Sequence, residues 1–418
     1  MEVIIVDAYS SGAYLAKKLY QAGARLTHIK TTHDIPPPVL ATYPNNVFYR
    51  EFSISDWEQS VKNADLPGAE NVVCIIPGTE TGVLLADHLV KDFRLKGNGF
   101  SKSASRRDKF QMTETLKQNG LATTSHYVTT DIDSLLQWIS KNMSYPVVIK
   151  PIDSAGSDGV RLCREQTDVI SATSYILYNT SKLGLENNHI LVQDFLEGNE
   201  FIVDTVSRDG LHLITDICRS VKRFRPNGVI NYDFIELVPF QGEAQTQLVN
   251  YFRQVLSALE IHFGAAHGEL MLTHNGPVLI EVAARLAGAN LPQIFGSHVT
   301  HNATDAMVDA CLFPRQFHKR LHQPSQLKTR CRIVFFELDM SGRLIKPMQH
   351  TEFSQLSSFS FLHWPHETNA VLPKTVDLFT SPGYVVLTHY NQQVIEDDTH
   401  AVRCQEKTHY EKWIEMDD

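Results

Sequence analysis

The chain has 418 residues, of which 43% are hydrophobic and 20% are charged, with a formal net charge of -9. This composition is typical of a globular protein with two or three domains, and the acidic balance argues against a general nucleic-acid binder. The six cysteines are scattered without a CxxC pair, and no run approaches the ~20 apolar residues of a membrane span. We therefore expect reduced, mostly buried thiols in a cytoplasmic protein that does not enter a membrane.

Residues 1 to about 100 alternate between short apolar runs and helical patterns. Strands are expected at 3–6, 26–29 and 71–76, and helices at 13–22 and 83–90. This alternation predicts an open α/β domain with a parallel sheet. The opening turn, DAYSSG, lacks the GxGxxG pattern, so no dinucleotide site is expected there. Glu80 follows the strand at 71–76, where open sheets place their ligands; a solvated loop carboxylate is the alternative.

Residues 101–196 contain helical patterns at 110–119, 131–143 and about 169–182, and a strand at 189–195. Between them, YPVVIKPIDSAGSDGVRLCR (145–164) predicts two strands, 147–149 and 160–163, joined by a glycine- and serine-rich loop. Lys150 lies at the exit of the first strand. Closely approaching backbone N–H groups and a lysine suit a polyphosphate, although an ordinary glycine hairpin with a snorkelling lysine has the same pattern.

The third part of the chain presents two acids on neighbouring strands. Strands are expected at 201–207 and 211–219, a helix at 245–261, and a two-stranded hairpin over 264–283 that carries Glu269 and Glu281. Paired carboxylates among apolar neighbours favour a cation, and hard oxygen ligands near phosphates suit Mg²⁺; a salt bridge from Glu281 to Arg285 is the alternative. The cationic run RSVKRFR (219–225), taken alone, is expected to be a solvated loop. Short runs at 331–338, 370–372 and 384–389 predict a small antiparallel subdomain.

Taken together, these motifs resemble the ATP-grasp enzymes. Lys109, the Lys150 hairpin, QDFLEGNE (193–200) and the set Glu269, Glu281 and Arg285 follow the order and spacing of that superfamily. The stretches LPGAENVVCIIPGTETGVLLADHL, GAAHGELML and IEVAARLAGANLP most resemble L-amino acid ligases that form dipeptides, such as the alanine–anticapsin type. The resemblance is strong over about 105–310, moderate before it and weak after it.

The resemblance implies an α/β (α+β) ATP-grasp fold. Its expected parts are an N-terminal open α/β domain (1–105), an ATP-grasp domain with a central antiparallel sheet (106–310, lid about 125–196), and a C-terminal β-rich subdomain (311–418). A homodimer is the family-level expectation.

It also implies roles for individual residues. Lysines would grip the ATP phosphates under a serine–glycine lid, and residues 193–196 would line the adenine edge. Glu200 would bind the ribose, and two apolar residues would pack under the base. The implied ATP-binding residues are Lys109, Lys150, Ser154, Ala155, Gly156, Ser157, Gln193, Asp194, Phe195, Leu196, Glu200, Met271 and Leu279.

The remaining implied roles concern metal and substrates. Glu269 and Glu281 would bind Mg²⁺, with Mn²⁺ as an alternative, and Arg285 would stabilise the acyl phosphate and the tetrahedral intermediate. The catalytic residue His267 and the loop Gly288, Ala289 and Asn290 would face the amino-acid pocket, and Glu80 would pair with a substrate amine.

Three positions depart from the family pattern. Relatives often carry Glu-x-Asn on the second metal strand, whereas position 283 is Ala, so one ligand is missing or comes from elsewhere. The hinge reads Gln193-Asp194 in place of Glu-Lys. Ala289 is small where a bulky residue would shrink the pocket, which leaves room for a larger substrate side chain.

The predicted activity is ATP-dependent ligation of a carboxylate to an amine through an acyl phosphate, with release of ADP and phosphate. Two amino acids are the expected substrates and a dipeptide the expected product. The alternatives are an ATP-grasp ligase whose acid or amine is not an amino acid, and a non-catalytic ATP-binding protein on the same fold.

Overall fold

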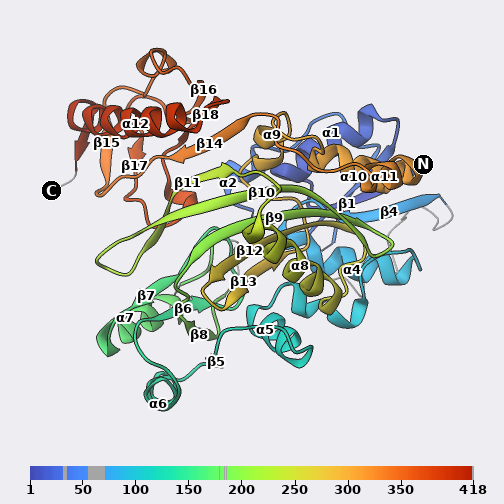
Figure 1. Cartoon of the computed structure of the whole chain (residues 1–418), viewed down its shortest axis with the longest axis horizontal. Helices are drawn as coiled ribbons and strands as arrows, with labels where there is room; N and C mark the ends of the chain where they lie inside the picture. The colour runs from blue at the N-terminus through green and yellow to red at the C-terminus, as the bar shows by residue number, and fades with distance from the viewer. Residues whose placement is uncertain (32–34, 55–70, 178, 183, 185, 417–418) are drawn as a thin grey trace.

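The computed structural model describes residues 1–31, 35–54, 71–177, 179–182, 184 and 186–416. Three groups of elements surround a long, curved central sheet (Figure 1). None of the helices in those ranges has the length and hydropathy needed to span a membrane. The mixed α/β fold class predicted from the sequence is confirmed.

The N-terminal part is the predicted parallel sheet, with strand order β3-β2-β1-β4. Its elements are β1 (Glu2–Val6), α1 (Ser11–Gln21), β2 (Arg25–Lys30), α2 (Pro37–Leu40), β3 (Arg50–Ser53), β4 (Val72–Pro77), η1 (Glu80–Gly82) and α4 (Val83–Asp92). Gly12 at the start of α1 faces Gly78 so closely that an added Cβ would lie 2.4 Å from the Gly78 Cα. The opening turn therefore needs glycine for backbone contact.

A second, antiparallel sheet with strand order β5-β8-β6-β7 lies within residues 125–196, where the lid is predicted. Two turns and a helix lead into it: η2 (Phe100–Lys102), η3 (Ala104–Arg106) and α5 (Lys109–Gln118). The lid itself contains β5 (His126–Thr129), α6 (Ile132–Asn142), β6 (Val147–Pro151), β7 (Arg161–Cys163), α7 (Gln166–Leu177) and β8 (Ile190–Asp194). The strand–loop–strand prediction around Lys150 is thus confirmed. Residue 178 of the predicted helix at 169–182 lies outside the described residues, as do the first five residues of the family-like stretch that begins at Leu66.

The central sheet has eight strands in the order β13-β12-β9-β10-β11-β14-β18-β16. Its first five strands along the chain are β9 (Asn199–Arg208), β10 (Leu211–Phe224), β11 (Ile230–Leu237), β12 (Gly264–Thr273) and β13 (Gly276–Ala283). The helices in this part of the chain are α8 (Glu243–Ala258), α9 (Leu291–Phe295), α10 (Ala303–Leu312) and α11 (Pro314–Leu321). One hydrophobic core joins the N-terminal sheet to this one, because α10 packs between α1 and β9.

The cationic segment 219–225 is not a solvated loop, which corrects the prediction. Residues 219–224 continue strand β10 and pair with β11 in antiparallel register. The Lys222 side chain is only 12% exposed, and the neighbouring arginines form ion pairs.

Three of the C-terminal strands, β14 (Arg330–Phe335), β16 (Phe359–His363) and β18 (Tyr384–His389), extend the central sheet. The other three, β15 (Gly342–Leu344), β17 (Val371–Leu372) and β19 (Ile414–Met416), form a small antiparallel sheet of their own. The turns η4 (His350–Glu352) and η5 (Leu378–Thr380) connect them. The sequence analysis missed α12 (Gln392–Trp413), which covers β18 and β14. The domain boundaries at 105 and 310 stay a prediction.

Candidate active site

A cavity lies between the lid sheet and the central sheet. We call it the central cavity. All thirteen residues predicted to bind ATP, and both predicted metal ligands, line it.

The floor of the central cavity is a row of charged side chains on adjacent strands. Glu281 on β13 stands directly opposite Glu269 on β12 in the strand register. Lys222 on β10 lies 2.7 Å from a carboxylate oxygen of Glu200 and 3.5 Å from Glu269. The hydroxyl of Tyr232 on β11 donates to Glu269 at 3.3 Å. Because strand residues two apart share a face, the sheet gathers these groups on one side.

Lysine ammonium groups offset the carboxylates of the floor. Although burial would favour the neutral forms, the carboxylates raise the pKa of Lys222 well above its usual range. Burial likewise opposes ionisation of Glu269, yet Lys222 and His267 hold the pKa of that carboxyl well below its ordinary value. Lys222 and Glu269 are therefore charged at neutral pH, and the sheet presents a compensated array of both signs.

The second wall carries the remaining lysines. Lys109, the first residue of α5, lies 3.0 Å from Glu281 and donates to the carbonyl oxygen of Ser154 at 2.9 Å. Lys150 at the end of β6 is buried, and this burial, together with the Lys109 charge, lowers the pKa of its ammonium to about 8. The loop that follows turns tightly, with Gly156 at φ 65 and Ser157 at φ 63. Cations and a loop of backbone N–H groups therefore line one end of the cavity, as a polyphosphate requires.

The other end of the central cavity is apolar and lies at the hinge after β8. Met271, Leu279 and Ile280 line it from the central sheet, and Phe224 packs edge-on against Phe195 with ring centroids 5.7 Å apart. The carboxylate of Asp194 accepts a hydrogen bond from the backbone N–H of Ser125 at 2.7 Å. An apolar slot of this kind suits a flat heterocycle.

A separate group of charges joins the N-terminal domain, the lid and the central sheet. We call this the Glu80 cluster: Glu80, Arg107, Asp153 and Arg285. Arg107 donates to both Glu80 and Asp153, and Arg285 Nε lies 2.7 Å from a Glu80 carboxylate oxygen. Burial opposes ionisation of Glu80, but the two guanidinium groups lower the pKa of its carboxyl to about 2.

This cluster contradicts two of the alternatives drawn from the sequence. Glu80 is only 9% exposed, so it is not a solvated loop carboxylate. Arg285 pairs with Glu80, whereas Glu281 pairs with Lys109, so the expected structural salt bridge between Glu281 and Arg285 is absent from the described ion pairs. Glu80 thus already contacts two guanidinium groups, and its pairing with a substrate amine stays a prediction.

His267 lies outside the central cavity but beside its acidic floor. Its Nδ1 is 2.6 Å from Asp204, and its Nε2 is 3.7 Å from Glu269. Burial alone would lower the pKa of the ring, but the Asp204 carboxylate raises it to about 10. His267 is therefore a cation that orients Glu269 at neutral pH, which makes it a poor general base.

The remaining predicted substrate residues lie away from the cavity lining. The loop 288–290 precedes α9, with Ala289 at φ 52 and Asn290 at φ 59. Ala289 packs against the aromatic core that contains Phe335 and Tyr384. Ala283 stands opposite His267 in the β12–β13 ladder, so position 283 offers no side-chain ligand. Within the described ranges, no group of three or more His, Cys, Asp or Glu side chains could hold a metal ion.

Sequence reasoning missed several lining residues of the central cavity. The polar ones are Thr124, Lys222 and Tyr232, and the apolar ones are Val148, Val160, Phe224, Ile230 and Ile280. Alternation along 219–225 was the available signal, because Lys222 and Phe224 line the cavity while Arg223 and Arg225 lie on the other face.

Comparisons with known proteins agree with this architecture. A family model described as an ATP-grasp domain matches residues 143–293. Dapdiamide A synthase from Enterobacter agglomerans is 27% identical over 98% of this chain and 96% of its own. Among solved structures, an L-amino acid ligase from Bacillus licheniformis has a TM-score of 0.73 at 18% identity, with 97% of both chains covered. N5-carboxyaminoimidazole synthase from Aspergillus clavatus, in complex with ADP and 5-aminoimidazole ribonucleotide, has a TM-score of 0.67 at 13% identity, covering 97% of this chain and 98% of its own.

Proposed function

We propose that this chain, in which residues 143–293 match an ATP-grasp domain, is an ADP-forming carboxylate–amine ligase. Its substrates in this proposal are two amino acids, and its product is a dipeptide or a related amide. The relative of nearly equal length, dapdiamide A synthase, and the L-amino acid ligase of the same fold support this choice of substrate class.

One observation carries the proposal. The central cavity has two lysines on one wall, two carboxylates in register on its floor and an apolar slot at the hinge. These are the groups that Mg-ATP needs: cations for phosphate oxygens, oxygen ligands for the metal, and a flat apolar surface for the base. Arg285 follows two residues after the end of the strand that carries Glu281, so a second group can bind next to the phosphates.

The donor set fits Mg²⁺. Glu269 and Glu281 are hard oxygen donors on facing strand positions, and ammonium groups now neutralise them: Lys222 for the first and Lys109 for the second. Mg²⁺ commonly takes one or two carboxylates and completes its shell with phosphate oxygens and water. When bound, the metal would neutralise charge on the transferred phosphoryl group.

The side chains of this chain would then act mainly by positioning. Lys109 and Lys150 would hold the phosphate oxygens, and the loop 154–157 would cover them and exclude water that hydrolyses an acyl phosphate. Arg285 would stabilise the negative charge that develops on the substrate carboxylate and then on the tetrahedral carbon. His267 would keep Glu269 in place. Glu80 would hold Arg285 until a substrate amine competes with Arg285 for the Glu80 carboxylate.

We extend the proposal to a cytoplasmic enzyme that forms a homodimer. The cytoplasmic assignment is supported by six free cysteines, five of them buried. The homodimer is a family-level expectation.

The test is ADP release with Mg-ATP across all pairs of the twenty amino acids, followed by mass spectrometry of positive pairs. Release that requires two amino acids, yields their condensed mass and disappears in Glu281→Ala and Arg285→Ala supports the proposal. Glu367→Ala is the matched control, because Glu367 is exposed and distant from the cavity lining.

Two other results would contradict it. ATP binding without release from any pair would favour a substrate that is not an amino acid, and the carboxyaminoimidazole synthase of the same fold shows that such chemistry exists on it. Nucleotide binding with no turnover for any acid and amine would favour a non-catalytic ATP-binding protein.

A further inference from the structure

The C-terminal part of the chain contacts the loop that borders the central cavity. Leu378, the first residue of η5, donates its backbone N–H to the carbonyl oxygen of Gly156 at 3.1 Å. A Cβ placed on Gly156 would lie 3.0 Å from the Phe379 ring and 3.3 Å from the Leu378 side chain. Two residues more than 200 positions along the chain therefore hold the tip of the loop 154–157.

The turn that makes these contacts is itself rigid. The Asp377 carboxylate accepts from the backbone N–H of Thr380 at 2.9 Å, and the Thr380 hydroxyl accepts from the N–H of Val376 at 2.9 Å. Ser381 donates to the carbonyl oxygen of Phe336 at 2.9 Å. Reciprocal side-chain bonds of this kind fix a short turn without a long helix.

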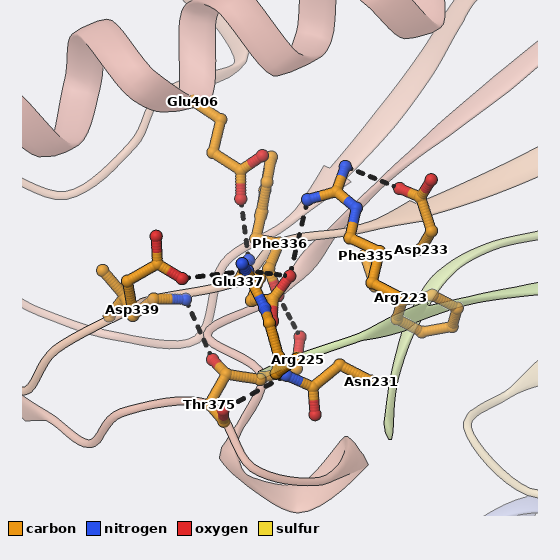
Figure 2. A network of polar contacts seen from close by, with 12 residues as sticks. Arg223, Arg225, Asn231, Asp233, Phe335, Phe336, Glu337, Asp339, Thr375 and Glu406 are labelled. Carbon is orange, nitrogen blue, oxygen red and sulfur yellow. Dashed lines mark hydrogen bonds and ion pairs between the residues drawn. The ribbon is translucent and has the colours of Figure 1, made fainter. Parts of the chain in front are cut away.

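A buried polar network anchors the turn to the floor of the cavity (Figure 2). Asn231 donates to the carbonyl oxygen of Thr375 at 3.2 Å and also to Glu337. Arg225 lies 2.6 Å from Glu337, and Arg223 lies 3.4 Å from it. Glu337 is only 8% exposed, so loss of these charge-assisted bonds would leave a buried charge without compensation.

The network and the cavity floor are the two faces of the same strand pair. Lys222 and Tyr232 face each other across β10 and β11 and line the cavity. The next pair along, Arg223 and Asn231, belongs to the network. The floor, the network, η5 and the loop tip thus form one continuous path of contacts around the cavity.

Phe379 is the unusual member of this path. Its side chain is 38% exposed, whereas Leu378 beside it packs against the core. A large apolar side chain held at the surface over a glycine does little for the core, but it covers the loop tip. The left-handed conformation of Gly156, φ 65, brings the loop backbone against the ring without an intervening side chain.

We propose that Leu378 and Phe379 are positioning residues that latch the loop 154–157 over the phosphate end of the central cavity. The C-terminal part of the chain is then a component of the nucleotide site, because it orders the loop before the nucleotide binds. Prior ordering lowers the entropic cost of binding, so the latch acts on nucleotide affinity more than on the chemical step. The identity of the ligand as a nucleotide rests on the proposed function.

The test compares Phe379→Ala with Phe313→Ala in the full chain. Phe313 is the matched control, since it is also 38% exposed and lies between α10 and α11. Amide hydrogen exchange at 154–158 in the nucleotide-free protein should accelerate on the order of tenfold in Phe379→Ala, and the Kd for ADP should rise about three- to tenfold. Phe313→Ala should change neither, and kcat at saturating ATP should fall less than KM rises.

A double-mutant cycle separates the contact from general loss of stability. Gly156→Ala should weaken ADP binding, and Phe379→Ala should make that added methyl less harmful, because the ring that it meets is gone. Additive effects, or unchanged exchange at 154–158 in a folded Phe379→Ala protein, would overturn the latch. The exchange measurement needs no turnover. It therefore tests the latch proposal independently of whether any amino-acid pair releases ADP.

Discussion

The central cavity and the Glu80 cluster differ in how their charged groups are neutralised. In the cavity, cations and carboxylates line an open space, and burial together with the Lys109 charge lowers the pKa of Lys150 to about 8. In the cluster, Glu80 directly contacts two guanidinium groups, and the pKa of its carboxyl falls to about 2. The cavity is prepared for an anionic ligand, whereas the cluster must exchange one of its internal ion pairs to receive a substrate.

The largest expected effect comes from removing Arg285, which should change kcat but not the affinity of the central cavity for ADP. Arg285→Ala should lower kcat about 10²- to 10³-fold, the usual cost of losing a group that stabilises developing negative charge. The Kd for ADP should stay within about twofold, because Arg285 does not line the central cavity. Arg285→Lys should not restore activity, since a lysine cannot reproduce the planar guanidinium.

Isothermal titration with ADP, beside steady-state assays, measures both quantities. Arg343→Ala, at an exposed position, is the control. A loss of ADP affinity as large as the loss of kcat would contradict the division between the two regions.

The next effect is on stability. Glu80→Gln leaves the buried Arg107 and the half-buried Arg285 with less opposing charge, and breaking a buried pair usually costs about 3–5 kcal/mol. Because the folded pKa of Glu80 lies below its ordinary value of 4.5, its contribution is fully present above about pH 4.5 and is lost as pH falls through about 2.

Urea unfolding at pH 7 and at pH 3 tests this expectation. The gap in unfolding free energy between wild type and Glu80→Gln should shrink at the lower pH. A gap that is the same at both values, or absent at pH 7, would show that the cluster contributes no net electrostatic stability.

The third effect belongs to the cavity. Burial and the Lys109 charge favour the neutral amine of Lys150, whereas a bound phosphate would favour the ammonium. Affinity for ADP should therefore be greatest below about pH 8 and fall up to about tenfold per unit above it. Lys150→Arg should remove this dependence between pH 7 and 9, because arginine stays protonated. Lys141→Arg, at an exposed lysine, should keep the wild-type profile, and a pH profile unchanged by Lys150→Arg would assign it to another group.

The sequence predicted the central cavity better than the Glu80 cluster, because the motifs of the cavity lie within short stretches of the chain. The cavity is built from hairpins and strand ends, so Lys150 with its glycine loop and the pair Glu269 and Glu281 are visible within short windows. The Glu80 cluster draws residues from four segments of the chain, and Arg107 belongs to none of the motifs that the sequence analysis identified.

Two further misses have physical reasons of the same kind. Four cations within 219–225 suggested a solvated loop, because nothing local shows that Lys222 has carboxylate partners on β9 and β12. Helix α12 buries polar residues, Glu406 and His409, as well as apolar ones such as Ile395 and Val402, so its apolar periodicity is weak. Burial of polar groups is decided by tertiary partners, and these residues find theirs in Arg403 and Glu352.

The smallest expected effect tests where the substrate side chain lies. Ala289 is half-buried against the aromatic core beside Phe335 and Tyr384, and it lies four residues after Arg285 in the sequence. Ala289→Phe should reduce kcat/KM about tenfold or more for the largest accepted amino acid and much less for the smallest, as expected when a pocket loses a few methylenes of space. Affinity for ADP should not change. Ala289→Gly is the matched control: it relieves the positive φ of this residue and adds no volume, so it should leave the size preference intact. If Ala289→Phe lowers kcat/KM equally for large and small amino acids, the loop 288–290 supports Arg285 instead of bounding the substrate, and the amino-acid pocket must be sought on the other side of the Glu80 cluster.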